Sequence, residues 1–446
     1  MKYFSLMTRN LLKMWVWLCS VCLLSSIAQA QISIDITEGN LDPLPIAVPD
    51  FIAEDARVAD IGRQVAEIVR ADLERSGLFN ALNPASFIET QTNIDYEPNF
   101  GSWRVIKAEA LVSGRIIRES ETRVRVEFRL WDIFGEKQLA GLRFGTTPDN
   151  IRRISHKVSD AIYEALTGET GYFDSRIVFI DEKGPKTNRT KRLAIMDEDG
   201  ANPQYLLAGS DIVLTPRFSP SSQKITFMSY ENTVPQIYLL DIETGRRELL
   251  GNFPGMTFAP RFAPDGESFI MSMVQRGNSD IYVMDLASRS TSRLTSDPAI
   301  DVSASFSPDG KNIVFNSDRG GSPQIYTMKA DGGSVKRITF GKGRYSAPVW
   351  SPRGDLIAFT KSEGGTFSIG VIRPDGTGER QLTDGYLVES PTWSPNGRVI
   401  LFTKETRGKN GSSEIWSIDL SGRNLRKVNT PGKASDPAWS PLLPAE

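Results

Sequence analysis

The second half of the chain repeats one short motif, and this repeat limits the possible folds more than any other feature. In each copy an aromatic residue is followed by a small residue and a proline, and the first copy closes at Pro220. The later copies close at Pro264, Pro308, Pro352, Pro395 and Pro441, so that successive prolines are 44, 44, 44, 43 and 46 residues apart. Self-similarity at a nearly fixed period indicates a repeat architecture in which every copy forms one supersecondary unit.

Each copy has the pattern of four short strands. After the proline comes a tight turn such as Asp309-Gly310, where the glycine can accept a positive φ. Runs rich in β-forming residues follow at 313–315 and 325–328, and a last short run ends near Thr339. Four strands per copy are the unit of a propeller blade, so we predict an all-β propeller for residues 169–446.

The two ends of this region complete each other. The sixth motif, residues 437–441, is followed by only five residues, whereas residues 176–208 read as a blade that lacks its innermost strand. A C-terminal strand that entered this blade would close six blades into a ring and protect the sheet edges. We therefore predict a six-bladed β-propeller closed by the C-terminal strand. The alternative is an open row of hairpins or a two-sheet sandwich.

The N-terminus has the pattern of an export signal. Three basic residues flank or precede an apolar run over 14–27, and residues 28–30, Ala-Gln-Ala, match a small-x-small cleavage site. An apolar run of about 14 residues is too short for a stable membrane span, which needs about 20. We expect residues 1–30 to be a cleaved signal peptide that sends a soluble protein to the periplasm, without direct membrane insertion.

Removal of this segment changes the charge and the cysteine content. Both cysteines, Cys19 and Cys22, lie within it, and the rest of the chain has 49 Lys and Arg against 54 Asp and Glu, a net charge of −5. An exported protein without disulfides must be held together by burial alone. Mild acidity without a basic stripe argues against a nucleic-acid partner, because no surface would neutralise phosphates.

Residues 31–168 lack the repeat and predict a compact α+β domain. We expect a strand over 45–51 and a helix from Asp60 to Gly77, whose apolar residues recur with helical spacing. Strict alternation over 123–130 predicts a half-buried strand. A second helix opens at Thr147-Pro148 and ends at Gly168.

Constellations typical of catalysis or metal binding are missing from the sequence. The one histidine, His156, lies about 200° around its helix from Ile154, so we interpret it as a solvent-facing residue. With one histidine and no cysteine outside the signal, neither a zinc site nor a catalytic triad is easily built. The acidic run over 197–200 lacks the spacing of a calcium-binding EF-hand loop and reads as a β-turn. We predict no catalytic residue, no metal and no cofactor.

The order of these parts resembles the TolB family, periplasmic proteins of the Tol–Pal system of Gram-negative bacteria. The matching stretches are Ile-Ala-Val-Pro-Asp-Phe at 46–51, Gly-Tyr-Phe at 171–173 and Pro-Ala-Trp-Ser-Pro-Leu at 437–442. The blade motifs alone are shared with peptidase propellers, so the order of the parts makes the resemblance specific. It implies a protein that is not an enzyme, binds the lipoprotein Pal over one mouth of the propeller channel, and binds TolA. The implied role is to maintain outer-membrane integrity and to support outer-membrane invagination during cell division. We expect a monomer.

The resemblance assigns TolA binding to the first residues of the mature chain. These are Gln31, Ile32, Ser33, Ile34, Asp35, Ile36 and Thr37. Their alternating isoleucines suit a strand added to a sheet edge, and equally an ordinary strand of the α+β domain. A segment able to dock or detach could also couple the two partners.

The resemblance places Pal binding in the loops that enter the innermost strands. By motif position the residues are Met256, Ala259, Asp301, Val302, Ser303, Ser346, Glu389, Ser390 and Asp436. Well-known family members have a histidine at the position of Met256 and a glutamate at that of Ser303, so individual contacts are expected to differ. The alternative is that these residues only keep the loops soluble.

Two other classes of function compete with this interpretation. A propeller lactonase or sugar-acting hydrolase would need convergent acids at a channel mouth, for which Asp301, Glu389 and Asp436 are available. A chaperone of outer-membrane proteins would instead bind unfolded porin segments. Thermal stabilisation by a divalent metal favours the enzyme, whereas stabilisation by Pal favours the binding protein.

Overall fold

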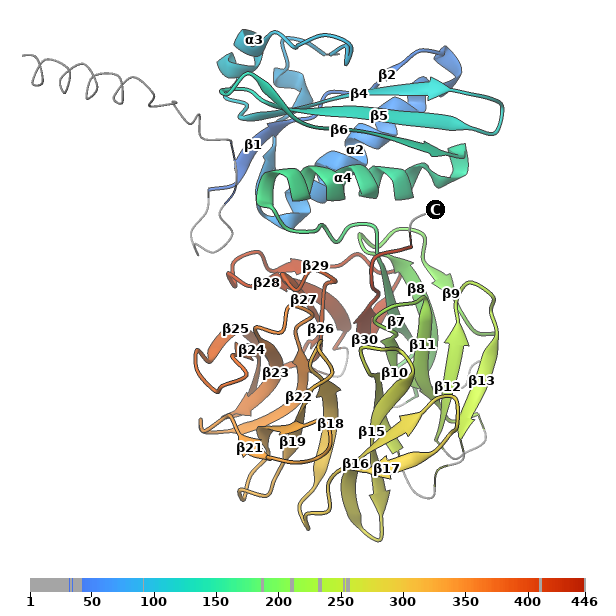
Figure 1. Cartoon of the computed structure of the whole chain (residues 1–446), viewed down its shortest axis with the longest axis vertical. Helices are drawn as coiled ribbons and strands as arrows, with labels where there is room; N and C mark the ends of the chain where they lie inside the picture. Colours follow the sequence, from blue (N-terminus) through green and yellow to red (C-terminus); the bar gives the residue numbers. More distant parts are fainter. Residues whose placement is uncertain are drawn as a thin grey trace, which may run out of the picture.

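The computed structural model describes residues 32, 34, 42–90, 92–185, 188–208, 212–231, 235–251, 253, 257–408 and 411–444. It has two parts, an α/β part formed by the first elements of the chain and a ring of β-sheets formed by the rest (Figure 1). The C-terminal end lies near the junction of the two parts (Figure 1). The last strand therefore returns to the place where the ring begins.

The sheet of the α/β part joins short parallel strands to an antiparallel meander. Its order is β3-β1-β4-β5-β6, and β2 pairs with β4 outside this path. β1 runs parallel to β3 and β4, whereas β4, β5 and β6 are antiparallel neighbours. The strands are β1 (Leu44–Ala47), β2 (Ile52–Ala53), β3 (Phe79–Ala81), β4 (Ala110–Arg118), β5 (Val124–Asp132) and β6 (Lys137–Thr146). The strand expected over 45–51 is thus shorter than predicted.

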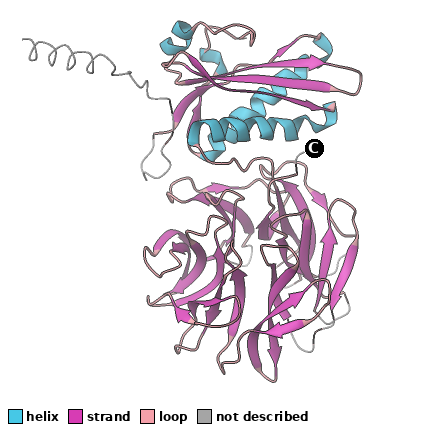
Figure 2. Cartoon of the chain, in the orientation of Figure 1, coloured by secondary structure: helices cyan, strands magenta, loops and turns pink. Residues whose placement is uncertain are grey.

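Two long helices, α2 (Ala59–Ser76) and α4 (Ile151–Thr167), lie between this sheet and the ring (Figure 2). Both end, as predicted, at a glycine in the left-handed conformation, Gly77 with φ 76° and Gly168 with φ 72°. The prediction that Asp60 caps α2 is wrong, because the helix begins one residue earlier, directly after a 3-10 turn. The shorter helical elements are α3 (Phe100–Val105), η1 (Ala56–Val58), η2 (Pro84–Ser86) and η3 (Pro148–Asn150).

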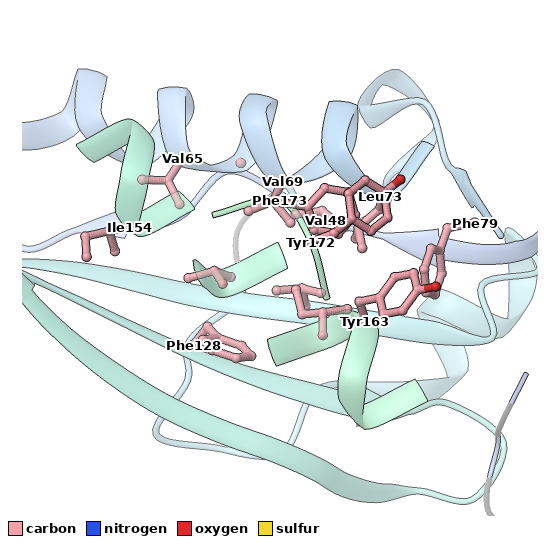
Figure 3. Close-up of a cluster of buried hydrophobic side chains, with 14 of the residues drawn as sticks. Val48, Val65, Val69, Leu73, Phe79, Phe128, Ile154, Tyr163, Tyr172 and Phe173 are labelled. Carbon is pink, nitrogen blue, oxygen red and sulfur yellow. The ribbon is translucent and has the colours of Figure 1, made fainter. Parts of the chain in front are cut away.

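The core of the α/β part includes the junction that leads into the ring. Side chains of α2, α4 and the sheet, such as Val69 and Phe128, meet Tyr172 and Phe173 in one buried cluster (Figure 3). The ring centroid of Tyr163 lies 6.0 Å from those of both junction aromatics, in edge-to-face geometry. Because burial of a phenylalanine contributes about 2 kcal/mol, these residues fasten the start of the ring to the helices.

The ring consists, in the described residues, of six four-stranded sheets. The first contains β30 (Lys433–Trp439), β7 (Arg176–Lys183), β8 (Thr190–Asp197) and β9 (Gln204–Tyr205). The second contains β10 (Val213–Phe218), β11 (Lys224–Ser229), β12 (Gln236–Asp241) and β13 (Arg247–Gly251). The third contains β14 (Thr257–Phe262), β15 (Ser268–Gln275), β16 (Asn278–Asp285) and β17 (Thr291–Arg293).

The other three sheets follow the same antiparallel order. The fourth contains β18 (Asp301–Phe306), β19 (Asn312–Ser317), β20 (Gln324–Lys329) and β21 (Lys336–Arg337). The fifth contains β22 (Arg344–Trp350), β23 (Ile357–Glu363), β24 (Thr366–Ile372) and β25 (Arg380–Gly385). The sixth contains β26 (Leu387–Trp393), β27 (Val399–Glu405), β28 (Ser413–Asp419) and β29 (Arg426–Lys427). Each sheet is one blade, which confirms the predicted six-bladed propeller.

The C-terminal strand closes the ring as predicted. β30 pairs antiparallel with β7, in a register that places Lys433 opposite Glu182 and Trp439 opposite Ile177. The indole Nε1 of Trp439 donates to Ser175 Oγ at 2.8 Å, and its ring lies edge-on to Tyr172 at 5.7 Å. The first and last parts of the propeller therefore share one blade and one set of buried contacts.

Every innermost strand is interrupted by a β-bulge at the same position of the repeat. The register shifts between Leu214 and Arg217 in β10, and at the matching place in the other five strands. Residues with positive φ stand at these bulges, namely Thr215, Ser303, Ala347, Ser390 and Asp436, with φ between 47° and 58°. A bulge leaves a residue outside the hydrogen-bonded ladder, which is why a proline can follow at positions such as 216 and 391.

An acidic turn of the first blade docks against the two helices. The turn after β8 has the carboxylates of Asp197, Glu198 and Asp199, which bind arginines of the α/β part. Arg75 of α2 lies 2.6 Å from Glu198, and Arg152 of α4 binds both aspartates. The acidic run therefore forms a turn, as predicted, and contributes to the contact between the two parts.

The prediction that His156 faces solvent is wrong. Its side chain is buried, with 3% exposed, and its Nδ1 lies 2.8 Å from Oδ2 of Asp72, a buried residue of α2. Ser159 also donates to this carboxylate at 2.7 Å. The helical angle between Ile154 and His156 showed only that His156 does not face the sheet. It did not show that α2 and the acidic turn cover a second face of α4. Burial disfavours the imidazolium, but the Asp72 carboxylate outweighs it and raises the pKa of His156 to about 9.

We expect the His156–Asp72 pair to make stability fall as the pH rises. The folded pKa of about 9 exceeds the ordinary value of 6.5, so the contribution is complete below pH 6.5 and is lost as the pH passes 9. From this group alone the free energy of unfolding should decrease by roughly 3 kcal/mol across that window. Urea unfolding at a series of pH values should show this slope in the wild-type protein and in the control Lys157→Gln, but not in His156→Gln. Equal slopes in all three proteins would contradict the assignment.

Candidate functional site

The propeller channel has two mouths that differ in their surroundings. The turns after the innermost strands lie beside the α/β part, where Asn396 Nδ2 donates to the carbonyl of Thr170 at 3.0 Å. Arg353 and Arg398, from two of these turns, bind the carboxylate of Glu169. Since an innermost strand of six or seven residues is about 20 Å long, its first residues lie at the opposite end. We call the end with the turns the near mouth, and the end with the strand starts the far mouth.

The far mouth is where the structure places most of the residues expected to bind Pal. They are Asp301, Val302 and Ser303 at the start of β18, Ser346 in β22, Glu389 and Ser390 in β26, and Asp436 in β30. Met256 lies outside the described residues, and Ala259 lies in β14 with a side chain that is not described. The prediction that they lie in the loops before these strands is wrong, because the strands begin earlier and include them. They occupy the first half of the innermost strands, on the side of the far mouth, and their binding role stays a prediction.

Carboxylates gather on one side of this mouth. Ser390 Oγ donates to Asp436 Oδ1 at 2.8 Å, which joins two neighbouring blades. Partial burial, and then repulsion from Asp436 and Glu405, raises the pKa of Glu389. Glu182 lies on the same side and is held by Ser435 Oγ at 2.8 Å and by Lys191 at 3.3 Å. This half of the mouth presents acidic side chains with a few basic neighbours.

Asp301 does not belong to this group. It is fully buried, and Arg319 Nη2 donates to its two carboxylate oxygens at 3.0 and 2.8 Å. The guanidinium in turn lies 5.3 Å from the ring centroid of Tyr326. Asp301 therefore anchors its blade, whereas the half-buried Ser303 and the exposed Ser346 remain on the surface of the mouth.

Two residues of the expected TolA segment are described, and both lie against the α/β part. Ile32 N donates to Asp132 Oδ2 at 3.3 Å, and Ile34 N donates to the carbonyl of Leu166, at the end of α4, at 2.8 Å. Both isoleucines are half-buried against the core. Neither is part of a strand, so the interpretation as an ordinary strand of the domain does not hold at these positions. Gln31, Ser33, Asp35, Ile36 and Thr37 lie outside the described residues.

Sequence reasoning did not find the charged side chains that lie beside the carboxylates of the far mouth. These side chains are those of Arg319, Glu405 and Lys191, and they come from segments other than those of the carboxylates. In the sequence they cannot be distinguished from solvent-exposed surface charges. Motif spacing places the strand starts, because it fixes the position of a residue within a blade. It carries no information on which charges of different blades meet.

One further group of potential metal ligands belongs to the contact between the two parts. Among the described residues, ligand atoms of His156, Asp197 and Asp199 lie within 4.8 Å of one another. Arg152 already binds both aspartates, and His156 is paired with Asp72. The group therefore has a structural explanation as part of the docked acidic turn. Among the described helices, none has both the length and the apolar character to cross a membrane.

Family comparisons cover both parts of the chain. A model described as the TolB beta propeller domain matches residues 163–443, and one described as the TolB amino-terminal domain matches residues 32–139. A curated relative, the Tol-Pal system protein TolB of Paramagnetospirillum magneticum, is 56% identical over 231 residues. The match covers 52% of this chain and 52% of the relative, so it spans about half the length of that protein.

One solved structure supports this relationship, and a second is reported beside it. The crystal structure of TolB from Acinetobacter baumannii has a TM-score of 0.78 and 33% identity, and the match covers 92% of this chain and 100% of that one. The putative TolB from Agrobacterium tumefaciens has 22% identity and a TM-score of 0.47, over 60% of this chain and 93% of that chain. With the two family models over its two parts and the A. baumannii protein matched along its whole length, this chain belongs to the TolB family.

Proposed function

We propose that the chain is a non-enzymatic, periplasmic component of the Tol–Pal system that binds Pal at the far mouth and TolA through residues 31–37. In this role it helps to maintain outer-membrane integrity and to support outer-membrane invagination during cell division. Family membership and the name of the P. magneticum relative support this proposal. The export signal pattern supports the location, although residues 1–30 lie outside the described residues.

The observation that carries the proposal is the strained backbone of the bulges in the innermost strands, which recurs at Thr215 and Ala347 and at three polar residues expected to bind Pal. Ser303, Ser390 and Asp436 have φ between 50° and 58°, a region that costs a non-glycine residue about 1–3 kcal/mol. Such strain persists where the surrounding structure over-determines it, and it concentrates at functional sites. Here the bulges keep polar side chains of several blades at the rim of one mouth. A rigid ring of this kind suits a protein partner that covers the mouth.

The arrangement of acids favours a binding protein over a hydrolase. Such an enzyme would need Asp301, Glu389 and Asp436 to converge on one substrate. Glu389 and Asp436 influence each other, but Asp301 is buried beneath Arg319 in another blade. A carboxylate held by two hydrogen bonds from a guanidinium is a stabilised anion and a poor general base.

The contacts of the N-terminal segment suit reversible docking. The backbone N–H of Ile32 donates to the Asp132 carboxylate, that of Ile34 donates to a backbone carbonyl, and both side chains are half-buried. Such hydrogen bonds contribute about 1 kcal/mol to a neutral acceptor and about 1.5–3 kcal/mol to a charged one, so TolA could compete for these contacts at modest cost. If Pal binding changes the population of the docked state, the segment would couple the two partners.

Deletion of residues 31–37 should separate the two binding sites. We expect calorimetry with purified soluble Pal still to detect binding, because the far mouth is unchanged, and any change in affinity would measure the coupling between the segment and the Pal site. Binding of TolA should be lost, because its segment is missing. Retention of both interactions would overturn the assignment of TolA binding, and loss of Pal binding would show that Pal does not bind at the far mouth alone.

A bulky side chain at the far mouth should block Pal. Ser346 is exposed at the rim, so Ser346→Tyr should weaken Pal binding about tenfold or more while the thermal stability of the propeller changes little. The matched control is Ser292→Tyr, on the exposed outermost strand β17, which should leave the affinity unchanged. Equal Pal affinity in the two variants would place the Pal site elsewhere.

A further inference from the structure

A cavity in the channel, separate from the far mouth, is lined by the residue that precedes the aromatic residue in each copy of the motif. These six residues are Arg217, Arg261, Ser305, Val349, Thr392 and Ala438. The cavity has a volume of about 390 Å³, and the closing prolines of the motifs also line it, so it lies in the half of the channel toward the near mouth. The repeat therefore builds a ring of inward side chains in which two neighbouring blades contribute arginine.

Among the residues that the structure describes, neither arginine has a carboxylate partner. Arg217 is 8% exposed, its Nη1 donates to the adjacent carbonyl of Pro216 at 2.6 Å, and its Nε has no hydrogen-bond partner. Within the described residues, no carboxylate lies at ion-pair distance from Arg217 or Arg261. Asp436 attracts Arg217 from farther away, but its own carboxylate accepts a hydrogen bond from Ser390. In the described part of the chain, the two guanidinium groups thus share a cavity with no carboxylate in direct contact, and Asp436 attracts Arg217 only from beyond ion-pair distance.

Electrostatic repulsion and burial of these two arginines lower the stability of the folded state. A buried charge is tolerated when it is paired, and an unpaired one destabilises the folded state. Burial lowers the pKa of both arginines, and the charge of Arg217 lowers that of Arg261 further. A guanidinium nevertheless stays protonated near neutral pH. The cavity therefore holds two positive charges that repel each other.

The other walls of the cavity supply no negative charge. The described residues that line it include no aspartate or glutamate, and their largest side chains are aromatic, such as Phe262 and Trp393. The hydroxyls of Ser305 and Thr392 accept hydrogen bonds from the backbone of the next blade, Trp350 N and Trp439 N. Among the described lining residues, the guanidinium groups of Arg217 and Arg261 are therefore the charged groups that can meet a ligand, and hydroxyls such as that of Thr392 can still donate their O–H.

We propose that this cavity is an oxyanion-binding site in which Arg217 and Arg261 together bind one carboxylate or phosphate group. The planar N–H fork of a guanidinium matches the paired oxygens of both groups, and two forks on adjacent blades can bind the same group from two sides. The aromatic walls would contact an apolar portion of an organic anion. Bound there, the anion would neutralise the charges and connect the second and third blades.

Inorganic phosphate and acetate serve as probes for the two chemistries. The full mature protein is heated with each salt, with sodium chloride at matched ionic strength as reference, and affinities are measured by calorimetry. We expect phosphate, acetate or both to raise the unfolding temperature beyond the chloride reference, because the ligand binds only the folded ring. The salt that acts identifies the preferred group. No specific stabilisation by either salt would overturn the proposal.

Arginine variants connect the effect to the cavity. Arg217→Gln and Arg261→Gln should each weaken binding of the active probe about tenfold or more, since each removes a charged hydrogen-bond donor. The control Arg246→Gln removes one charge from an exposed turn and should bind as the wild type does. Without anion, Arg261→Gln should unfold at the same temperature as the wild type or a higher one, because the positive charge that repels the buried Arg217 is gone. Unchanged binding in both cavity variants, or a less stable anion-free Arg261→Gln, would contradict the proposal.

Discussion

The structure depends first on the pairing of β30 with β7. These strands come from opposite ends of the propeller sequence, and their pairing turns a row of blades into a ring without a free inner edge. The same contact brings Trp439 to Ser175 and Tyr172, which belong to the junction with the α/β part. Closure of the ring and attachment of the helices are therefore one set of interactions. A rigid channel with two distinct mouths follows from them.

Charged residues lie in three separate places in the molecule, and their pairing differs from one place to the next. At the contact between the two parts, the acidic turn of the first blade meets Arg75 and Arg152, and His156 is held by Asp72. At the far mouth, acids lie beside strained backbone and remain partly accessible. In the channel, arginines of two blades have no carboxylate at ion-pair distance among the described residues. Buried pairs fix an arrangement of elements, whereas unpaired or exposed charges indicate where a ligand or partner can bind.

The repeat predicted the blades, the closing strand and the position of the far mouth, because prolines at a constant period report where each innermost strand lies. Sequence reasoning failed for α4, which packs against both the sheet and α2. The helical angle placed His156 outside because it considered the sheet alone, although Ser155 and Ser159 on the same side of α4 permit the close approach of a second helix. The repeat motif likewise assigns no role to the residue before its aromatic position, which is where Arg217 and Arg261 stand. Only the closed ring shows that this motif position faces a cavity.

Native-state hydrogen exchange of the backbone amides in β30 and β7 tests the ring closure most directly. The amides of Ala434 and Ala438, together with those of β7, should be protected to the same degree as the amides of the other innermost strands, and all should exchange through global unfolding. Protection that is lost in β30 alone, with β7 still protected, would show that the C-terminal strand opens independently, and would contradict a propeller held closed by its last strand.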